Sequence, residues 1–362
     1  MTLWRQVIMF GVFKMALIEE ALASLLKGRV QPKKGKVTYK PYSATSARLT
    51  AGLIAKKAPE VMVKITGFSY GTGGLKSHFD YIARTDDPNK DNVEIENERG
   101  QVFEGKQEVG EGYSAWVDDI NSYPKAKRSR EVVNLVLSMP AGTDPEKVKE
   151  AVRRFAKNAF SENHEYVFAL HTDEDHPHVH LDIKMRGYNQ VKLNPRKADL
   201  QNWREGFAEE LRGLGVVAVA SNRRARGITK KSVNSIVKQI NSSDKSHKSS
   251  VAKTTALQTK EAVDELISEA KGSAARDKPW GKALEANLKD VKSQYVEVIN
   301  LLMATNKKED LQLAGELKSF LGGVPNKVIT QHDDLKRKAL ENVSGVKQVK
   351  EVEKVKDASL SR

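Results

Sequence analysis

A short stretch near the middle of the chain alternates strictly between apolar and polar residues, and it limits the fold more than any other feature. Residues 178–185 read HVHLDIKM. Successive side chains of a β-strand point to opposite faces of the sheet. One face of this strand is therefore apolar and belongs to a core. The other face predicts a polar surface on a sheet, and it carries His178, His180, Asp182 and Lys184.

Histidines are concentrated around this strand. The chain has eight histidines in 362 residues, and four of them lie in ALHTDEDHPHVHLDIK, residues 169–184. A preceding strand pattern, YVFALH, ends at His171, and residues 172–177 return the chain. Antiparallel pairing of the two strands places His171 opposite His178 and His180. We therefore expect these three imidazoles to converge on one ion.

The chemistry of this cluster favours a divalent metal with open coordination positions. The chain has no cysteine, so a thiolate site and disulfides are excluded. Three neutral imidazoles without thiolates leave coordination positions open, which suits catalysis better than a structural role; a structural zinc site or a satisfied polar cluster is the alternative. The ion expected here is Mg²⁺ or Mn²⁺, with Zn²⁺ as a further candidate. Asp173 and Asp175 are candidate acceptors for imidazole N–H groups or solvated turn residues. Asp182 is a candidate fourth ligand or orienting group.

The pattern of the surrounding segments predicts an α+β fold. Strands are expected at 61–68, 131–140, 166–171 and 178–185, a glycine-rich loop at 69–74, and helices at 75–84, 141–160 and 198–215. This order favours a central antiparallel sheet with helices packed on one face, followed by a mostly helical C-terminal region. The expected divisions are an N-terminal helix and basic linker (1–58), the α+β domain (59–232), a basic flexible connector (233–256), and a helical region with a tail (257–362).

The net charge of +14 predicts a polyanionic partner. Nucleic acid is the first candidate, and an anionic membrane surface is the rival. No uninterrupted run of about 18 apolar residues occurs, so stable membrane insertion is not expected, and the absence of cysteine fits a cytoplasmic location. A cluster after the second long helix is either a grip on backbone phosphates or a solvated linker, and it comprises Arg223, Arg224, Arg226, Lys230 and Lys231.

A metal on a basic protein suggests phosphate chemistry, with either water or a hydroxyl side chain as nucleophile. In the helix expected at 75–84, Leu75, Phe79 and Ile82 form the apolar stripe. Tyr81 lies off that stripe by the rule of 100° per residue. It is therefore a candidate nucleophile or an ordinary amphipathic tyrosine, and Tyr70 in the glycine-rich segment is its rival.

Several of these segments resemble the conjugative relaxases, which are mobilization nucleases of the HUH superfamily. HTDEDHPHVH resembles their third motif, and HFDYIAR resembles their first, which carries the nucleophilic tyrosine at the position of Tyr81. MPAGTD, NRRARGIT and WREGFAEELRGLG resemble segments of the T-DNA border endonuclease branch. The resemblance covers residues 60–232. Many relatives have Asn where this chain has Lys184, which adds a positive charge that would contact a phosphate or weaken metal binding. Ser129 and Ser138 are the candidates for the second motif.

The resemblance implies nicking of one DNA strand at the transfer origin of a plasmid or integrative element. Tyr81 would attack the scissile phosphate and remain linked to the 5′ end. The implied partners are single-stranded origin DNA, accessory relaxosome proteins and a type IV secretion coupling protein. A rolling-circle replication initiator shares this fold and chemistry. A non-catalytic, DNA-binding mobilization accessory protein with a structural metal is the alternative from another class.

Overall fold

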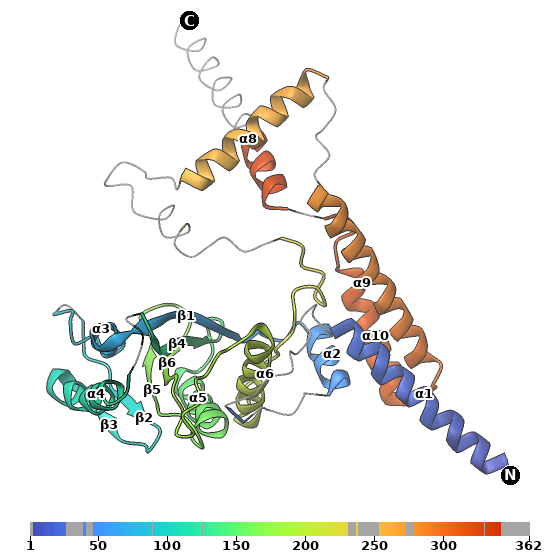
Figure 1. The fold of residues 1–362 in the computed structure, drawn as a ribbon. Coiled ribbons are helices and arrows are strands. Elements are labelled where there is room, and N and C mark those ends of the chain that lie inside the picture. The colour runs from blue at the N-terminus through green and yellow to red at the C-terminus, as the bar shows by residue number, and fades with distance from the viewer. Residues whose placement is uncertain are drawn as a thin grey trace, which may run out of the picture. The chain divides into compact units, whose positions relative to one another are not determined.

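The structure is a computed structural model that describes residues 3–26, 39–40, 46–88, 90–124, 126, 128–230, 237, 253–272, 279–328 and 330–341. Its centre is an antiparallel sheet of six strands in the order β1-β4-β6-β5-β2-β3 (Figure 1). The strands are β1 (Met62–Tyr70), β2 (Ile95–Asn97), β3 (Val102–Phe103), β4 (Arg130–Ser138), β5 (Tyr166–His171) and β6 (His178–Lys184). The strand with the histidine pair is thus an interior strand, between β4 and β5.

One face of the sheet packs against α5 (Pro145–Phe160) and α6 (Lys197–Gly213). Helix α5 begins where the sequence predicts, because the Asp144 side chain accepts a hydrogen bond from the backbone N–H of Glu146 at 3.0 Å and Pro145 occupies the first turn. The core on this face joins both helices to the apolar sides of β1, β4, β5 and β6, and it includes Phe155, Leu181 and Trp203. This is the core predicted from the alternation in residues 178–185.

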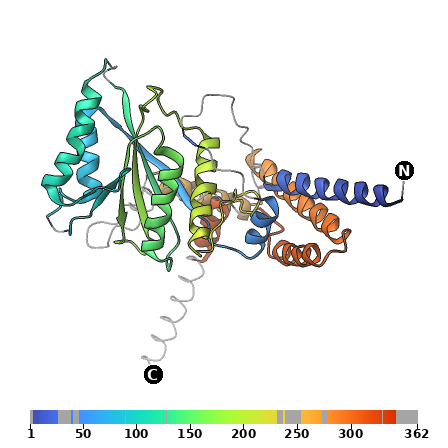
Figure 2. The same ribbon diagram turned by 90° about the horizontal axis from the view of Figure 1, so that it is seen from below.

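The opposite face of the sheet is also covered by helices, so the expectation of helices on one face is wrong. Figure 2 shows the sheet between the two helix layers. The second layer consists of α3 (Gly71–Ala83) and α4 (Gly105–Asn121), and its core includes Phe79 and Trp116, whose ring centroids are 5.2 Å apart. The polar face of β6 is therefore largely buried rather than an open surface.

The predicted strands and the three predicted helices are confirmed, with shifted boundaries. The expected glycine-rich loop is instead the end of β1 and the first turn of α3, since that helix begins at Gly71. Gly71 has φ +60°, a left-handed value that glycine adopts without strain, and this allows the strand to turn directly into the helix. Strands β2 and β3 and helix α4 lie in the segment 85–130, where the sequence gives no regular pattern.

The chain divides into two compact units, residues 1–222 with 298–320 and residues 223–297 with 321–362. The first unit adds α1 (Leu3–Leu26), α2 (Ala47–Ala55) and α10 (Lys308–Gly322) to the sheet domain. Arg48 of α2 joins these helices through ion pairs with Glu19 and Asp310. Helix α2 thus lies within the segment expected to be a basic linker.

The second unit contains α8 (Lys253–Ala270) and most of α9 (Pro279–Met303), in agreement with the helical region expected after residue 257. The phenol of Tyr295 on α9 donates a hydrogen bond to the carbonyl of Ala225 at 2.6 Å. The expected connector, 233–256, falls mostly outside the described residues. None of the helices in the described part of the chain has the length and apolar character needed to cross a membrane.

Candidate metal centre and nucleophile

The hairpin of β5 and β6 brings together the three predicted histidines. His171 pairs with His178 across the two strands, and Ala169 pairs with His180. The ring of His171 lies 5.3 Å from that of His178 and 4.6 Å from that of His180, between centroids. One nitrogen from each ring lies within 4.8 Å of the others. A single ion can therefore contact all three imidazoles.

Hydrogen bonds determine which nitrogen each histidine can offer. Nε2 of His171 lies 2.8 Å from the carbonyl oxygen of Ile82, so that nitrogen carries the proton and Nδ1 has the lone pair. Nδ1 of His178 lies 3.4 Å from the carbonyl oxygen of His176, which leaves Nε2 as its ligand atom. Main-chain oxygens thus orient two of the three rings.

His180 is the least satisfied polar side chain of the cluster. Both of its ring nitrogens are buried and have no hydrogen-bond partner within the described part of the chain. Burial and the neighbouring imidazoles lower the pKa of His180 to about 3, and burial also lowers the pKa of His171. Neutral imidazoles with unused lone pairs are what a divalent metal requires, so the donor set fits such an ion.

Tyr81 lies beside this cluster and is exposed, as its position off the apolar stripe predicts. Its side chain is 53% exposed, whereas Phe79 and Ile82 are buried. The Tyr81 ring is 5.5 Å from that of His180 and 6.4 Å from that of His171, between centroids. Tyr70 is also exposed, but it ends β1 and makes no ring contact with the histidines in the part of the chain that the structure describes.

A fourth histidine, His78, belongs to the site and was missed in the sequence. It lies on α3, three residues before Tyr81, and the two rings are nearly parallel, 5.7 Å apart at an angle of 14°. The spacing of three residues, which places side chains on neighbouring positions of a helix surface, is the signal that identifies it. His78 therefore connects the candidate nucleophile to the sheet below.

Asp182 lies under His78 and is completely buried. One of its carboxylate oxygens lies 3.1 Å from Nε2 of His78 and accepts a hydrogen bond from the Asn134 amide at 2.9 Å. Asn134 in turn lies 3.4 Å from the hydroxyl of Ser69. In this geometry Asp182 orients His78, and it is not among the residues that converge with the three histidines.

The two aspartates of the hairpin loop have other contacts. Asp173 forms an ion pair with Arg84 at 2.6 Å and lies 4.0 Å from Lys90, and Asp175 is exposed. Within the described residues neither carboxylate accepts a hydrogen bond from a histidine ring of the cluster. The orienting contacts predicted for these carboxylates are made by the carbonyl oxygens of Ile82 and His176 instead.

The DNA contact expected of Lys184 is contradicted by its burial. The side chain is only 4% exposed, and its ammonium pairs with Asp119 at 2.6 Å and with Glu165 at 3.2 Å. Helix α4, which carries Asp119, covers this end of the strand. A lysine buried between two carboxylates is neutralised inside the protein and is not available to a phosphate.

The remaining predicted residues are not among those that converge with the histidines. Arg224 is paired with Asp290 and Lys230 with Asp334, both within the second unit, while Arg223 and Arg226 are partly buried there. Lys231 lies outside the described residues. Of the two serines considered for a further motif, Ser138 is buried on β4, and Ser129 accepts a hydrogen bond from Lys192 at 2.5 Å.

Comparison with known proteins gives a family match over the segment that contains this hairpin. Residues 87–212 match the family model described as "Relaxase: MobA/VirD2-like, nuclease domain". In this segment the chain resembles the conjugative relaxases. The match includes the three histidines of the cluster and begins after Tyr81, so the tyrosine is placed by the geometry of α3 alone.

The curated relatives are T-DNA border endonucleases named VirD2. The protein from Rhizobium radiobacter is 28% identical over 141 residues, which are 35% of this chain and 33% of the relative. The protein from Rhizobium rhizogenes is 31% identical over 129 residues, which are 32% of this chain and 30% of the relative. This chain thus spans about a third of the length of the curated relatives it matches.

A solved structure described as "Molecular Basis of Vancomycin Resistance Transfer in Staphylococcus aureus" is also similar. The likeness covers 45% of this chain and 98% of the other, with 16% identity and a TM-score of 0.33. At this TM-score it carries no argument about this protein.

Proposed function

We propose that the sheet domain nicks one strand of DNA by metal-assisted tyrosine transesterification. The observation that carries this proposal is the exposed ring of Tyr81 beside three histidines whose nitrogens converge, with both nitrogens of His180 buried and without a partner within the described residues. Metal-assisted phosphoryl transfer needs a nucleophile next to a metal site, and here the two candidates are adjacent. The match to a relaxase nuclease domain supports the same reaction class.

His171, His178 and His180 would hold one divalent ion, Mg²⁺ or Mn²⁺ with Zn²⁺ as the alternative. The ion supplies Lewis-acid stabilisation of the charge that develops on a non-bridging phosphate oxygen. Burial lowers the pKa of His171 and of His180, which favours their neutral forms, and the carbonyl oxygens of Ile82 and His176 orient the rings of His171 and His178. These contacts leave Nδ1 of His171 and Nε2 of His178 available as ligand atoms, and one nitrogen of each of the three rings lies within 4.8 Å of the others.

The phenol oxygen of Tyr81 forms a new bond to phosphorus, and the bond from phosphorus to the 3′ oxygen of the preceding nucleotide breaks. The tyrosine loses its proton, and the departing 3′ oxygen gains one. The products are a 5′-phosphotyrosyl link to the protein and a free 3′ hydroxyl. Because one phosphodiester replaces another, the reverse reaction can rejoin strands without ATP.

The substrate is a single-stranded segment of DNA at a transfer origin of a mobile element such as a plasmid. Only an unpaired strand can place its scissile phosphate across the exposed Tyr81 ring and the histidine cluster. The relatives are named as endonucleases of the T-DNA border, which agrees with cleavage at a defined DNA site. Accessory relaxosome proteins and a type IV secretion coupling protein are the further partners of this proposal.

The test is a search for a covalent protein–DNA adduct. Full-length protein is incubated with Mn²⁺ and single-stranded oligonucleotides that tile the DNA around its own gene, then separated by denaturing electrophoresis. We expect one oligonucleotide to give an adduct that chelator and Tyr81→Phe abolish and that Tyr70→Phe retains. Cleavage by Tyr81→Phe would contradict the assignment of the nucleophile. Binding without cleavage by the wild type would favour a non-catalytic accessory protein.

A further inference from the structure

His78 is placed to act on Tyr81 rather than on the metal. Its ring lies almost parallel to that of Tyr81, with centroids 5.7 Å apart and 14° between the planes. It faces the His180 ring edge-on at 6.4 Å, and it is not one of the three residues whose nitrogens converge. The closest ring in parallel orientation to the candidate nucleophile is therefore this imidazole.

His78 on α3 is held by a contact with Asp182 on strand β6 of the sheet. Nε2 of His78 lies 3.1 Å from the carboxylate of Asp182, which has no exposure to solvent. Asp182 is held by the amide of Asn134 on the neighbouring strand β4. A buried carboxylate favours a nearby N–H donor in addition to the Asn134 amide, so the close contact with Asp182 disfavours movement of the His78 imidazole away from it.

Tyr81 has no comparable anchor of its own. Its side chain is about half exposed, and the neighbours that its ring has within the described residues are the rings of His78, His171 and His180. An exposed tyrosine on a helix samples more than one rotamer. Two of its neighbours are used by the metal site, which leaves His78 as the ring that can restrict this motion.

We infer that His78 is a positioning residue that holds the Tyr81 ring above the histidine cluster by stacking, while Asp182 holds His78. Asp182, His178 and His180 are on the same strand, β6, so one element helps to position the nucleophile and carries two of the three candidate metal ligands. The inference rests on the proposed function for its importance, and the stacking itself can be measured without any cleavage.

The first measurement uses NMR spectra of full-length protein with ¹³C-labelled tyrosine rings. The chain has nine tyrosines, and the signals of Tyr81 and Tyr70 are those lost in Tyr81→Phe and Tyr70→Phe. Stacking predicts an upfield ring-current shift for Tyr81, whereas Tyr70, which is similarly exposed, should resonate near free tyrosine. A Tyr81 signal at the position of free tyrosine in the wild type would overturn the inference without any His78 variant.

The second measurement compares His78→Phe with His78→Leu. Both variants lose the contact with Asp182, and only phenylalanine keeps a flat ring. We expect His78→Leu to lose the Tyr81 shift and to slow single-turnover cleavage about tenfold at saturating DNA, with an unchanged Kd for DNA. His78→Phe keeps the flat ring but loses its anchor on Asp182, so it should keep part of the shift and have a rate between those of His78→Leu and the wild type. Ser77→Ala, on the same helix with its hydroxyl bonded to Gly73, is the control and should match the wild type.

Equal shifts and rates in His78→Leu and the wild type would overturn the inference, as would a His78→Phe variant that is as slow and unshifted as His78→Leu. Thermal melts of each variant check that the fold is retained. If the wild type shows the stacked Tyr81 signal but forms no adduct, the proposed function fails and the stacking inference stands. The two claims are therefore separable.

Discussion

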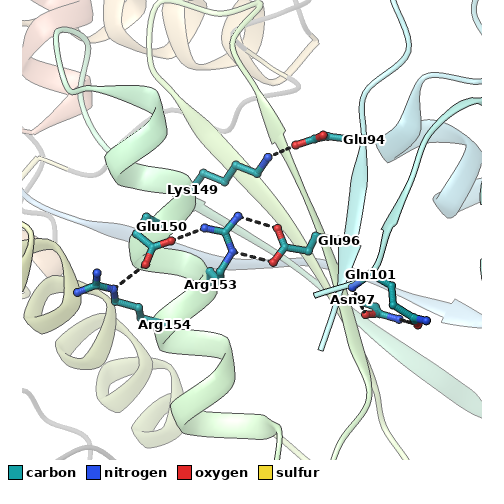
Figure 3. Close-up of polar contacts among 8 residues, drawn as sticks. All are labelled: Glu94, Glu96, Asn97, Gln101, Lys149, Glu150, Arg153 and Arg154. Carbon is teal, nitrogen blue, oxygen red and sulfur yellow. Dashed lines mark hydrogen bonds and ion pairs between the residues drawn. The ribbon is translucent and has the colours of Figure 1, made fainter. Parts of the chain in front are cut away.

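Two polar clusters on this sheet domain differ in how their charges and hydrogen bonds are satisfied. In the first, shown in Figure 3, Arg153 of α5 binds Glu96 of β2 through two hydrogen bonds, at 2.7 and 2.6 Å. The same arginine pairs with Glu150, which also pairs with Arg154, and Lys149 pairs with Glu94. In this cluster every charged side chain faces an opposite charge.

The histidine cluster at the end of β5 and β6 has the opposite character. Three like groups are gathered where both nitrogens of His180 lack a partner within the described residues. Buried polar groups without partners are rare in proteins, because each costs free energy of desolvation. The paired network therefore stabilises the short β2 strand on the sheet, whereas the unsatisfied nitrogens of His180 are those that the proposed metal ion would bind.

The largest effect is expected from breaking the unpaired cluster. His180→Ala removes one of three candidate ligands, and nicking of single-stranded DNA should fall about a thousandfold or more, since a metal contributes several kcal/mol to phosphoryl transfer. Binding of the uncleaved oligonucleotide should change little. His164→Asn is the matched control, because this buried histidine bonds to the carbonyl of Lys184 and lies outside the cluster. Nicking by His180→Ala at the wild-type rate would contradict a role of a histidine-bound metal in the reaction.

Breaking the paired network should affect stability instead. Glu96→Gln weakens the double hydrogen bond to Arg153 and should lower the free energy of unfolding by about 1 kcal/mol, discounted because the Arg153 side chain is 37% exposed. Urea denaturation measures this change, and the nicking rate of the folded protein should stay at the wild-type value. Glu94→Gln, whose carboxylate is more exposed, should cost less. A Glu96→Gln protein with wild-type stability but impaired nicking would contradict the assignment of this network to stability.

The smallest effect is expected from the arginines that follow the sheet domain. Arg224 is paired with Asp290, whereas Arg223 has no ion pair within the residues the structure describes. If ion pairing decides which arginines contact DNA, Arg223→Ala should remove one phosphate contact. The slope of the logarithm of the DNA-binding constant against the logarithm of the salt concentration should then become shallower by about 0.7, the value for one contact on single strands. Arg224→Ala should change it less. Equal slopes for both variants would show that ion pairing in the free protein does not predict DNA contacts.

The sequence was most informative where the geometry is local. Strict alternation from His178 to Met185 was enough to predict that His171, His178 and His180 converge, because two paired strands place side chains by simple periodicity. The helical period of 100° per residue likewise placed Tyr81 off the buried stripe of its helix. These predictions needed no knowledge of the rest of the chain.

The predictions that were wrong depended on contacts between distant segments. Helix α4 is rich in charged residues and glycine, and its few apolar anchors, such as Trp116, gave no clear period. Because that helix covers the sheet, Lys184 is buried against Asp119 instead of facing DNA. His78 was missed for the same reason, since its importance comes from Asp182, more than a hundred residues away in the sequence.

The central claim is that the unsatisfied histidine cluster is a metal site, and calorimetric titration of Mn²⁺ tests it without any DNA. Metal-free full-length protein and its His180→Ala variant are titrated under the same conditions. The account predicts about one ion per wild-type chain, with affinity lowered about a hundredfold or lost in the variant. Binding of Mn²⁺ with the same stoichiometry and affinity by the wild type and by His180→Ala would contradict it.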